Sequence, residues 1–405
     1  MVLVVFLVVY AGMILGGVPR LPVDRTGVAL LGAIALMLSG VVSLDAAVGY
    51  LDVPTLALLF SMMVLSAQLR LGGFYSALTH RLARSPLSAP LLLASVIGIT
   101  GLLAAVFTND IVALTVAPVL LYACQQKKLN PIPFLLALAC AVNVGSATTL
   151  IGNPQNMLIG QVLHLSFAHY TLVAFLPSLL GLGIVWFVIA RRYHTALSTP
   201  APLVDATYLP ETYPFDAWQT TKGLLLALLL LFFFLFTDFP RELTALACAA
   251  TVLLNRTFHT REMLGLVDWE LLVLFAGLFI VNGAMLDSGL TQQGLEQLAA
   301  LGISLRHPAW LFGLTVVLSN TVSNVPAVML LLPTTDASLG GPVLALASTL
   351  AGNLLIVGSI ANIIVVDQAA RRAILITGRE HARVGIPVTL LTLALAAATL
   401  WLFAP

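Results

Sequence analysis

The chain has 405 residues, of which 60% are hydrophobic and only 9% are charged, and its mean hydropathy is +1.04. Soluble domains carry about 25% charged residues, so this composition argues against a water-soluble protein and makes the lipid bilayer the expected environment. The formal net charge of +1 argues against a nucleic-acid partner and against a polybasic protein of the membrane surface.

Apolar segments recur along the whole chain and are long enough to cross a hydrocarbon core, which takes roughly 17–25 residues. The first one lacks the basic region and cleavage site of a signal peptide, so it is expected to be a membrane helix. Ten segments are predicted to span: 2–18, 27–43, 53–70, 133–163, 170–190, 222–237, 243–255, 268–286, 342–370 and 384–403.

Two further apolar stretches, 89–122 and 308–336, are interrupted in the middle by polar residues. Their arms look too short for a full crossing, which predicts two re-entrant helical hairpins. With ten spans and two hairpins, all but two of the 18 Lys and Arg residues fall on one side, the exceptions being Arg241 and Arg306. Cytoplasmic loops are enriched in these residues, so both termini are predicted to lie outside the inner membrane of a bacterial cell.

The halves of the chain resemble each other at a shift of about 215 residues. The segment from Asp52 to Gly73 matches the segment from Asp268 to Gly289. The polar residues 193–221 read as a cytoplasmic linker between an N-terminal repeat, 1–192, and a C-terminal repeat, 222–405. Five spans and one hairpin per repeat make the second repeat inverted, as in many secondary transporters, whose solute sites lie near the midplane where the repeats meet.

Each repeat also contains a predicted broken helix, 133–163 in the first and 342–370 in the second. Unpaired backbone groups are tolerated at membrane depth only inside protein or beside a wet cavity. A broken helix presents free N–H groups at one end and free C=O groups at the other. The expected helix breaks are Gly145, Gly152, Pro154, Pro326, Gly352 and Gly358.

The polar residues at the hairpin tips and helix breaks are the candidate substrate-binding residues. As a set in matching positions they favour a solute site over simple polar contacts between helices. They are Thr108, Asn109, Ser146, Thr148, Asn153, Asn156, Ser323, Asn324, Asn353, Ser359 and Asn362.

Asp110 is the only carboxylate predicted near the bilayer midplane, and its counterpart in the second repeat is Val325. An ionisable residue at this depth is costly and is a functional candidate, although Asp is also a good helix N-cap. Asp110 is therefore expected to carry a coupling proton or to help bind Na⁺. No cofactor beyond these coupling ions is expected.

Other chemistry is not supported by the sequence. The cysteines Cys124, Cys140 and Cys248 are far apart, and the histidines lie in loops or at predicted span ends, so no metal site is expected. No Walker motif or nucleophile elbow occurs, which argues against an ATP-driven pump and a membrane enzyme.

The sequence resembles the ion transporter superfamily, in particular the bacterial arsenite permease and the YbiR-type anion permeases. The resemblance rests on Phe107–Asp110, Ile151–Asn156, Ser323–Pro326 and Gly358–Asn362, and it extends over nearly the whole chain. It implies an elevator-type secondary carrier that forms a homodimer, and it is compatible with a cytoplasmic ATPase subunit as a partner.

Among substrates, proton-coupled efflux of arsenite or antimonite is favoured, because no Lys or Arg falls at the predicted site. Arsenous acid is a neutral hydroxide that Asn, Ser and Thr can bind through its hydroxyl groups. The alternatives are a sodium-coupled symporter of an oxyanion or dicarboxylate, a sodium/proton antiporter and a passive channel. Ser319-Asn320-Thr321 occurs only in the second half, whereas the sodium–dicarboxylate branch is expected to carry this motif twice.

Overall fold

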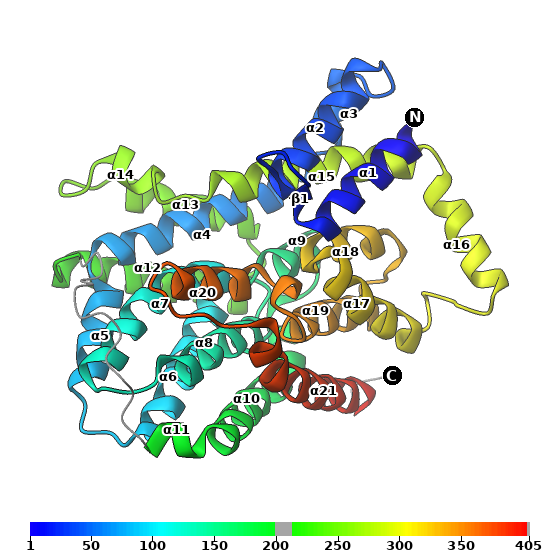
Figure 1. Cartoon of the computed structure of the whole chain (residues 1–405). Coiled ribbons are helices and arrows are strands. Elements are labelled where there is room, and N and C mark those ends of the chain that lie inside the picture. Colours follow the sequence, from blue (N-terminus) through cyan, green and yellow to red (C-terminus); the bar gives the residue numbers. More distant parts are fainter. Residues whose placement is uncertain (199–212, 403–405) are drawn as a thin grey trace.

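The computed structural model describes residues 1–198 and 213–402, and these residues are helical apart from one short pair of strands (Figure 1). Six of the described helices are long and apolar enough to cross a membrane. They are α4 (Val53–Leu71), α6 (Ala89–Val106), α10 (Phe167–Arg192), α12 (Ala217–Phe236), α15 (Trp269–Asp287) and α21 (Gly378–Leu402).

The N-terminal helices are shorter than predicted. Both α1 (Val2–Leu15) and α2 (Arg25–Leu38) have 14 residues. Helix α1 ends early because Gly16 adopts the left-handed conformation, with φ at 82°. The antiparallel strands β1 (Gly17–Val18) and β2 (Val23–Asp24) connect them.

The order of elements recurs along the chain at the shift seen in the sequence. Asp52 and Asp268 each cap a helix of 19 residues by accepting a hydrogen bond from the backbone three residues on. After each helix a left-handed glycine, Gly73 or Gly289, starts an amphipathic helix of 11 residues that the hydropathy pattern did not predict. These two helices are α5 (Phe74–Arg84) and α16 (Leu290–Ala300).

Both predicted hairpins are pairs of helices joined by a sharp turn. The first consists of α6 and α7 (Asn109–Gln126), with 18 residues each, so each arm is about 27 Å long at a rise of 1.5 Å per residue. This is longer than the short arms expected from the sequence. The second consists of α17 (Pro308–Val322) and α18 (Asn324–Leu331), followed by the 3₁₀ turn η1 (Leu332–Thr334).

Both predicted broken helices are interrupted. The first is α8 (Pro131–Ser146) followed by α9 (Pro154–Val162), and Asn153 caps α9 directly before a proline at its first position. The second is α19 (Gly340–Ala351), the 3₁₀ turn η2 (Ile356–Gly358) and α20 (Ile360–Ala370).

Three of the residues predicted at helix breaks lie at the ends of helices beside a break rather than within it. Gly145 lies inside α8 rather than at a break, and a Cβ there would stand 2.2 Å from the carbonyl oxygen of Gly101. Its role is thus close packing between α6 and α8. Pro154 and Pro326 lie in the first turns of α9 and α18. Backbone N–H groups in the first turn have no partner within the helix, so the N–H group that proline lacks is not needed there, and these prolines start helices.

The remaining helices are α3 (Leu44–Tyr50), α11 (His194–Ser198), α13 (Arg241–Leu253) and α14 (Thr260–Leu264). Of the predicted linker 193–221, the first residues form α11 and the last ones belong to α12, which begins at Ala217. The linker residues 199–212 lie outside the described part of the chain.

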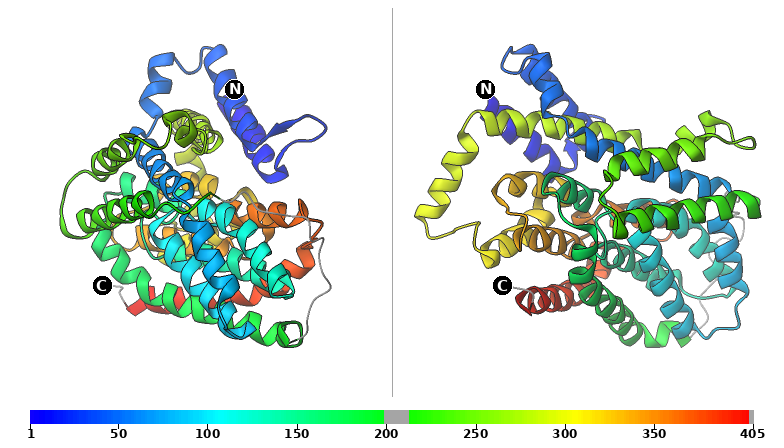
Figure 2. Two further views of the ribbon diagram at one scale, coloured as in Figure 1. Left: turned by 90° about the vertical axis from the view of Figure 1, so that its left-hand side faces the viewer. Right: turned by 180° about the vertical axis from the view of Figure 1, so that it is seen from behind.

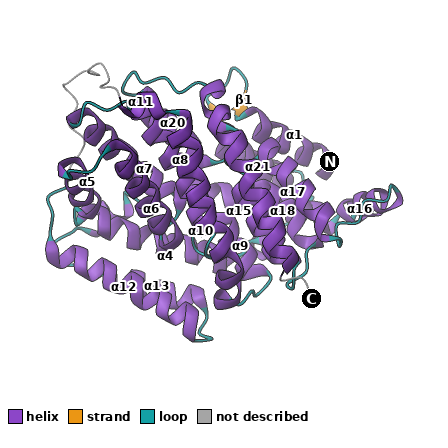
Figure 3. Ribbon diagram, turned by 90° about the horizontal axis from the view of Figure 1, so that it is seen from below, coloured by secondary structure: helices purple, strands orange, loops and turns teal. Residues whose placement is uncertain are grey.

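The helices form two groups, visible in Figures 1 and 2 and in the view from below in Figure 3. In one group α1, α2 and α15 contact each other, and α4 contacts α12 and α13. The other contains the hairpins and broken helices, flanked by α10 and α21, which pack against each other.

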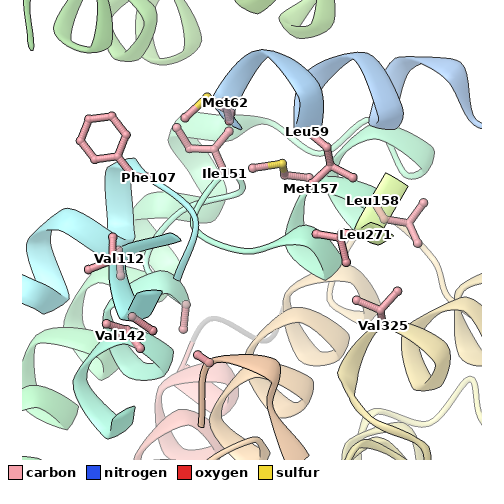
Figure 4. Close-up of a cluster of buried hydrophobic side chains, with 14 of the residues drawn as sticks. Leu59, Met62, Phe107, Val112, Val142, Ile151, Met157, Leu158, Leu271 and Val325 are labelled. Atoms are coloured by element: carbon pink, nitrogen blue, oxygen red, sulfur yellow. The ribbon is translucent and has the colours of Figure 1, made fainter. Parts of the chain in front are cut away.

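Hydrophobic side chains fill the contact between these two groups, as the close-up in Figure 4 shows. Leu59 and Met62 of α4 and Leu271 of α15 lie there together with Met157 of α9 and Val325 of α18. All five side chains are buried. Apolar packing therefore holds α9 of the first broken helix and α18 of the second hairpin against α4 and α15 at this contact.

Candidate functional site

A buried hydrogen-bond network connects the two halves of the chain, and Asn143 of α8 lies at its centre. Its Nδ2 donates to Oδ1 of Asn353 at 2.9 Å and to Oδ1 of Asn362 at 3.0 Å. Its Oδ1 accepts from Nδ2 of Asn109 at 3.1 Å and from Oγ of Ser359 at 2.9 Å. The structure thus brings four predicted site residues together around one residue that the prediction omitted.

A second part of the network crosses the first helix break. Nδ2 of Asn153 donates to Oγ of Ser146 at 3.1 Å and to Oγ1 of Thr349 at 3.2 Å. The Thr349 hydroxyl in turn donates to Oδ1 of Asn156 at 3.2 Å. Thr349 belongs to α19, so a residue of the second half ties the break of the first half in place.

The second hairpin tip carries backbone strain. Ser323 has φ at 76°, an uncommon conformation for a residue with a side chain, and such strain concentrates at functional sites. The next residue, Asn324, has its amide placed to donate to the carbonyl oxygens of Ser348 at 3.0 Å and Gly358 at 2.9 Å. This tip is therefore anchored to both arms of the second broken helix.

Close approaches explain the glycines at the breaks, by backbone at Gly152 and by asparagine side chains at Gly352 and Gly358. A Cβ at Gly152 would lie 2.2 Å from the carbonyl oxygen of Ser146, and one at Gly352 would lie 2.9 Å from the side-chain amide group of Asn324. At Gly358 a Cβ would be 2.8 Å from Oδ1 of Asn320. These three predicted positions have no room for a side chain.

Four buried polar atoms at the hairpins have no hydrogen-bond partner among the described residues. They are the hydroxyl groups of Thr108 and Ser319 and the Oδ1 atoms of Asn109 and Asn320. Buried polar atoms are nearly always paired, so unpaired ones call for an explanation. Their position at both hairpins makes them candidate groups for binding a solute.

Unpaired buried hydroxyl groups also occur in α4, α10 and α21 of the described structure, whereas a different cluster of amide side chains is satisfied. Gln219 of α12 accepts from Nε2 of Gln68 at 2.8 Å and from Nδ2 of Asn255 at 2.9 Å, and its own Nε2 donates to Thr257 at 2.9 Å. The amide groups here satisfy one another. This cluster holds α4, α12 and α13 together and serves as a structural reference for the network around Asn143.

Asp110 is buried, with 8% of its surface exposed, and it is the second residue of α7. The N-cap position belongs to Thr108, so Asp110 does not cap the helix. A carboxylate in the first turn is stabilised by the positive end of the helix dipole. Its counterpart Val325 lies in the apolar cluster of Figure 4, so the hairpins differ in charge as predicted.

Not every predicted residue joins the network. Thr148 lies in the first break but is only half-buried, and Asp110 flanks the network without a hydrogen bond to it in the described structure. The prediction in turn missed Asn143, Thr349, Tyr170 and His381. His381 was placed at a span end, yet it is 1% exposed and its Nε2 lies 3.0 Å from the carbonyl oxygen of Asn353.

Polar helix breaks inside a multi-pass helical protein are typical of membrane transporters. Residues 2–343 match the family model described as citrate transporter. The chain therefore belongs to the citrate transporter family of the ion transporter superfamily and is a secondary transporter, which confirms the superfamily predicted from the sequence motifs.

Individual relatives agree with this assignment. The chain is 29% identical to the silicon efflux transporter LSI3 of Oryza sativa subsp. japonica, over 93% of this chain and 92% of the relative. It is 30% identical to a putative transporter arsB of Dictyostelium discoideum, over 40% of this chain and 29% of the relative. The fold is similar to that of the YdaH transporter of Alcanivorax borkumensis, with a TM-score of 0.60, 16% identity, and 100% and 98% of the two chains covered.

Proposed function

We propose that this protein exports a neutral metalloid hydroxide, arsenite or antimonite, in exchange for protons. The observation that carries the proposal is the neutral character of the network around Asn143. Its members are Asn, Ser and Thr residues, and two hydroxyl groups and two amide oxygens beside it lack partners. Unpaired oxygens accept hydrogen bonds from the hydroxyl groups of arsenous acid without a cation at the site.

The relatives support this substrate class. One is named as a silicon efflux transporter, and silicon dissolves in neutral water as uncharged silicic acid, which is also a hydroxide. Another is named arsB. Both names point to small neutral molecules that present several hydroxyl groups.

In this proposal Asp110 is the proton-carrying residue. A buried carboxylate beside neutral amides changes charge when it binds a proton, and this change can be linked to occupation of the site. No counterpart exists in the second half, where Val325 is apolar. Sodium ions are the alternative coupling ion at the same position.

The proposed architecture is two inverted repeats of five spans and one re-entrant hairpin, with a bacterial inner-membrane location, both termini outside and a homodimer. Elevator movement of the hairpins and broken helices against α4 and α15 is supported by their apolar contact in Figure 4. The contact made by Met62, Met157 and aliphatic side chains contains no hydrogen bonds of its own, and methionine adapts easily to new neighbours. Movement would still break a few hydrogen bonds at its edges, such as that from Arg241 to the carbonyl oxygen of Gly160.

A second candidate, sodium-coupled transport of an oxyanion or dicarboxylate, is favoured by one observation. A cavity of about 450 Å³ is lined by Arg70 of α4 and by Arg371 and Arg372 directly after α20. Clustered guanidinium groups bind carboxylates and phosphates well. The family model is also described as citrate transporter.

Solute flux into or out of proteoliposomes distinguishes these two candidate functions. Arsenite, phosphate, succinate and sodium are each measured with and without an imposed pH gradient. We expect arsenite to move against its gradient when protons flow in the opposite direction. Succinate movement that requires sodium, in the absence of arsenite movement, would refute the first proposal.

The role of Asp110 is tested in the same vesicles with Asp110→Asn. We expect arsenite to equilibrate at most, without accumulation driven by the pH gradient. Asp367→Asn is the matched control, because Asp367 pairs with Arg371 on the surface at 2.7 Å. Coupled transport by Asp110→Asn at the native level would end the proposal for Asp110.

A further inference from the structure

Two helices that flank the site, α10 and α21, each hold one helix break through the fourth residue of the helix. In α10 this is Tyr170, whose hydroxyl donates to the carbonyl oxygen of Ala147 at 2.8 Å. In α21 it is His381, whose Nε2 lies 3.0 Å from the carbonyl oxygen of Asn353. A carbonyl oxygen only accepts hydrogen bonds, so Nε2 of His381 carries a proton.

The two carbonyl groups have equivalent positions in the broken helices. Ala147 directly follows α8, and Asn353 lies two residues after the end of α19. Carbonyl groups at the end of a helix have no partner within the helix and need one elsewhere. Tyr170 and His381 supply it, and both side chains are 1% exposed.

Asn353 connects His381 to the centre of the site. Its backbone carbonyl faces His381, while its side chain accepts the hydrogen bond from Asn143. One turn beyond His381, Gly385 approaches so closely that a Cβ there would lie 2.2 Å from the same carbonyl oxygen. The start of α21 is therefore fitted closely around the second break.

The two anchoring residues differ in their chemistry. Tyrosine keeps its proton at physiological pH, with an ordinary pKa near 10, whereas histidine is the side chain that changes charge between about pH 5 and 8. The anchors are thus alike in geometry and unlike in their response to protons. This is a second difference between the halves, in addition to Asp110 and Val325.

Few charged groups surround His381. The packed elements α8, α19 and η2 contain no Asp, Glu, Lys, Arg or His, and Cys140 is the only titratable residue of α8. The titratable residues of α10 and of the rest of α21 are His169, Tyr170, Arg191, Arg192, Arg379, Glu380 and Arg383. Glu380 accepts a hydrogen bond from the hydroxyl of Tyr193 at 3.0 Å.

We propose that His381 is a positioning residue whose Nε2–H group holds the second helix break, and whose protonation makes transport sensitive to pH on the cytoplasmic side. The proposal rests on the proposed function of this break as part of the solute site and on the predicted cytoplasmic position of the turn before α21. A positive charge on the ring, next to the network, opposes the approach of the coupling proton.

The test uses full-length protein in proteoliposomes and three variants. His381→Gln keeps an amide donor but does not titrate, His381→Phe removes the donor, and Tyr170→Phe is the matched control in the other half. Native arsenite flux is expected to fall as the pH on the cytoplasmic side is lowered from 8 to 5, mostly towards the acidic end, because a buried histidine ring resists taking up a charge.

The flux of His381→Gln should fall by a smaller factor than the native flux over the same range, which contains the histidine titration, and near pH 7.5 it should exceed the flux of His381→Phe. His381→Phe should lose most of its flux at every pH, and Tyr170→Phe should lose flux but keep the native pH dependence. The proposal is overturned if His381→Gln retains the native pH dependence, or if His381→Phe transports like the native protein.

A measurement without solute separates this proposal from the proposed substrate. As the pH is lowered, the thermal unfolding midpoint of the purified native protein should fall further than the midpoint of His381→Gln. If the native midpoint falls further on acidification and no arsenite is transported, the proposed substrate is wrong and the proposed role of His381 stands. If arsenite moves and the midpoints of the two proteins respond identically to pH, the role of His381 is wrong.

Discussion

Replacing Asn143 by Ala removes the centre of the buried network and affects both halves of the chain at once. The substitution deletes the hydrogen bonds to Asn109, Asn353, Asn362 and Ser359. Side-chain hydrogen bonds between membrane helices contribute about 0.6 kcal/mol each on average, and up to about 1.7 kcal/mol. Four such bonds amount to roughly 2 kcal/mol or more, about a 30-fold change in an equilibrium constant.

This loss should appear in two measurements. The thermal unfolding midpoint should fall, and the KM for the transported solute should rise by about tenfold or more, because the groups that bind it are no longer held in place. Gln219→Ala is the control, since it breaks the satisfied cluster of α4, α12 and α13, and it should lower the midpoint without raising KM. An Asn143→Ala protein that folds and keeps the native KM would refute the reasoning.

Three further predictions concern other parts of the fold. Gly152→Ala should destabilise the protein by about 1–3 kcal/mol through overpacking against the carbonyl oxygen of Ser146, seen as a lower unfolding midpoint; an unchanged midpoint would contradict it. Arg241→Gln should slow transport and lower the midpoint, because Arg241 donates to the carbonyl oxygen of Gly160 near the end of α9 at 3.2 Å; native flux and midpoint would contradict it. In the loop before α19 the Ser338 hydroxyl holds the pKa of the Asp336 carboxyl below its ordinary value. A carboxyl group with a lowered pKa stabilises the fold at neutral pH, and this stability is lost on acidification. Below about pH 4 the unfolding midpoint of Asp336→Asn should therefore fall less than the midpoint of the native protein, which unfolding curves measured over a series of pH values will show.

The positions of the helix breaks follow from local chemistry and were predictable from the sequence. Asn153 before Pro154 is a strong helix start, and Gly352 and Gly358 stand where no side chain fits. Asn143 was not predictable in this way, because it sits in an uninterrupted part of α8 and three of its four partners lie more than 200 positions away. Its signal in the sequence is only a polar residue inside a strongly apolar segment.

The anchoring residues were missed for a related reason. Tyr170 and His381 lie near the ends of apolar segments, where an aromatic residue or a histidine is unremarkable in a membrane protein. Only the packing of α10 and α21 against the breaks turns them inward. The amphipathic helices α5 and α16 escaped prediction because their length and polarity resemble those of loops.

The two halves differ at the residues that can change charge, and this difference bears on coupling. Helices of equal length, matching caps and matching left-handed glycines give both halves the same frame around the network. If both hairpins carried a carboxylate, or both anchors were histidines, a proton could bind equivalently from either half. With Asp110 opposite Val325 and His381 opposite Tyr170, the proposed proton-binding groups belong to different halves and different elements. A carrier built in this way can bind its solute within a symmetric frame and still link one proton to one direction of movement.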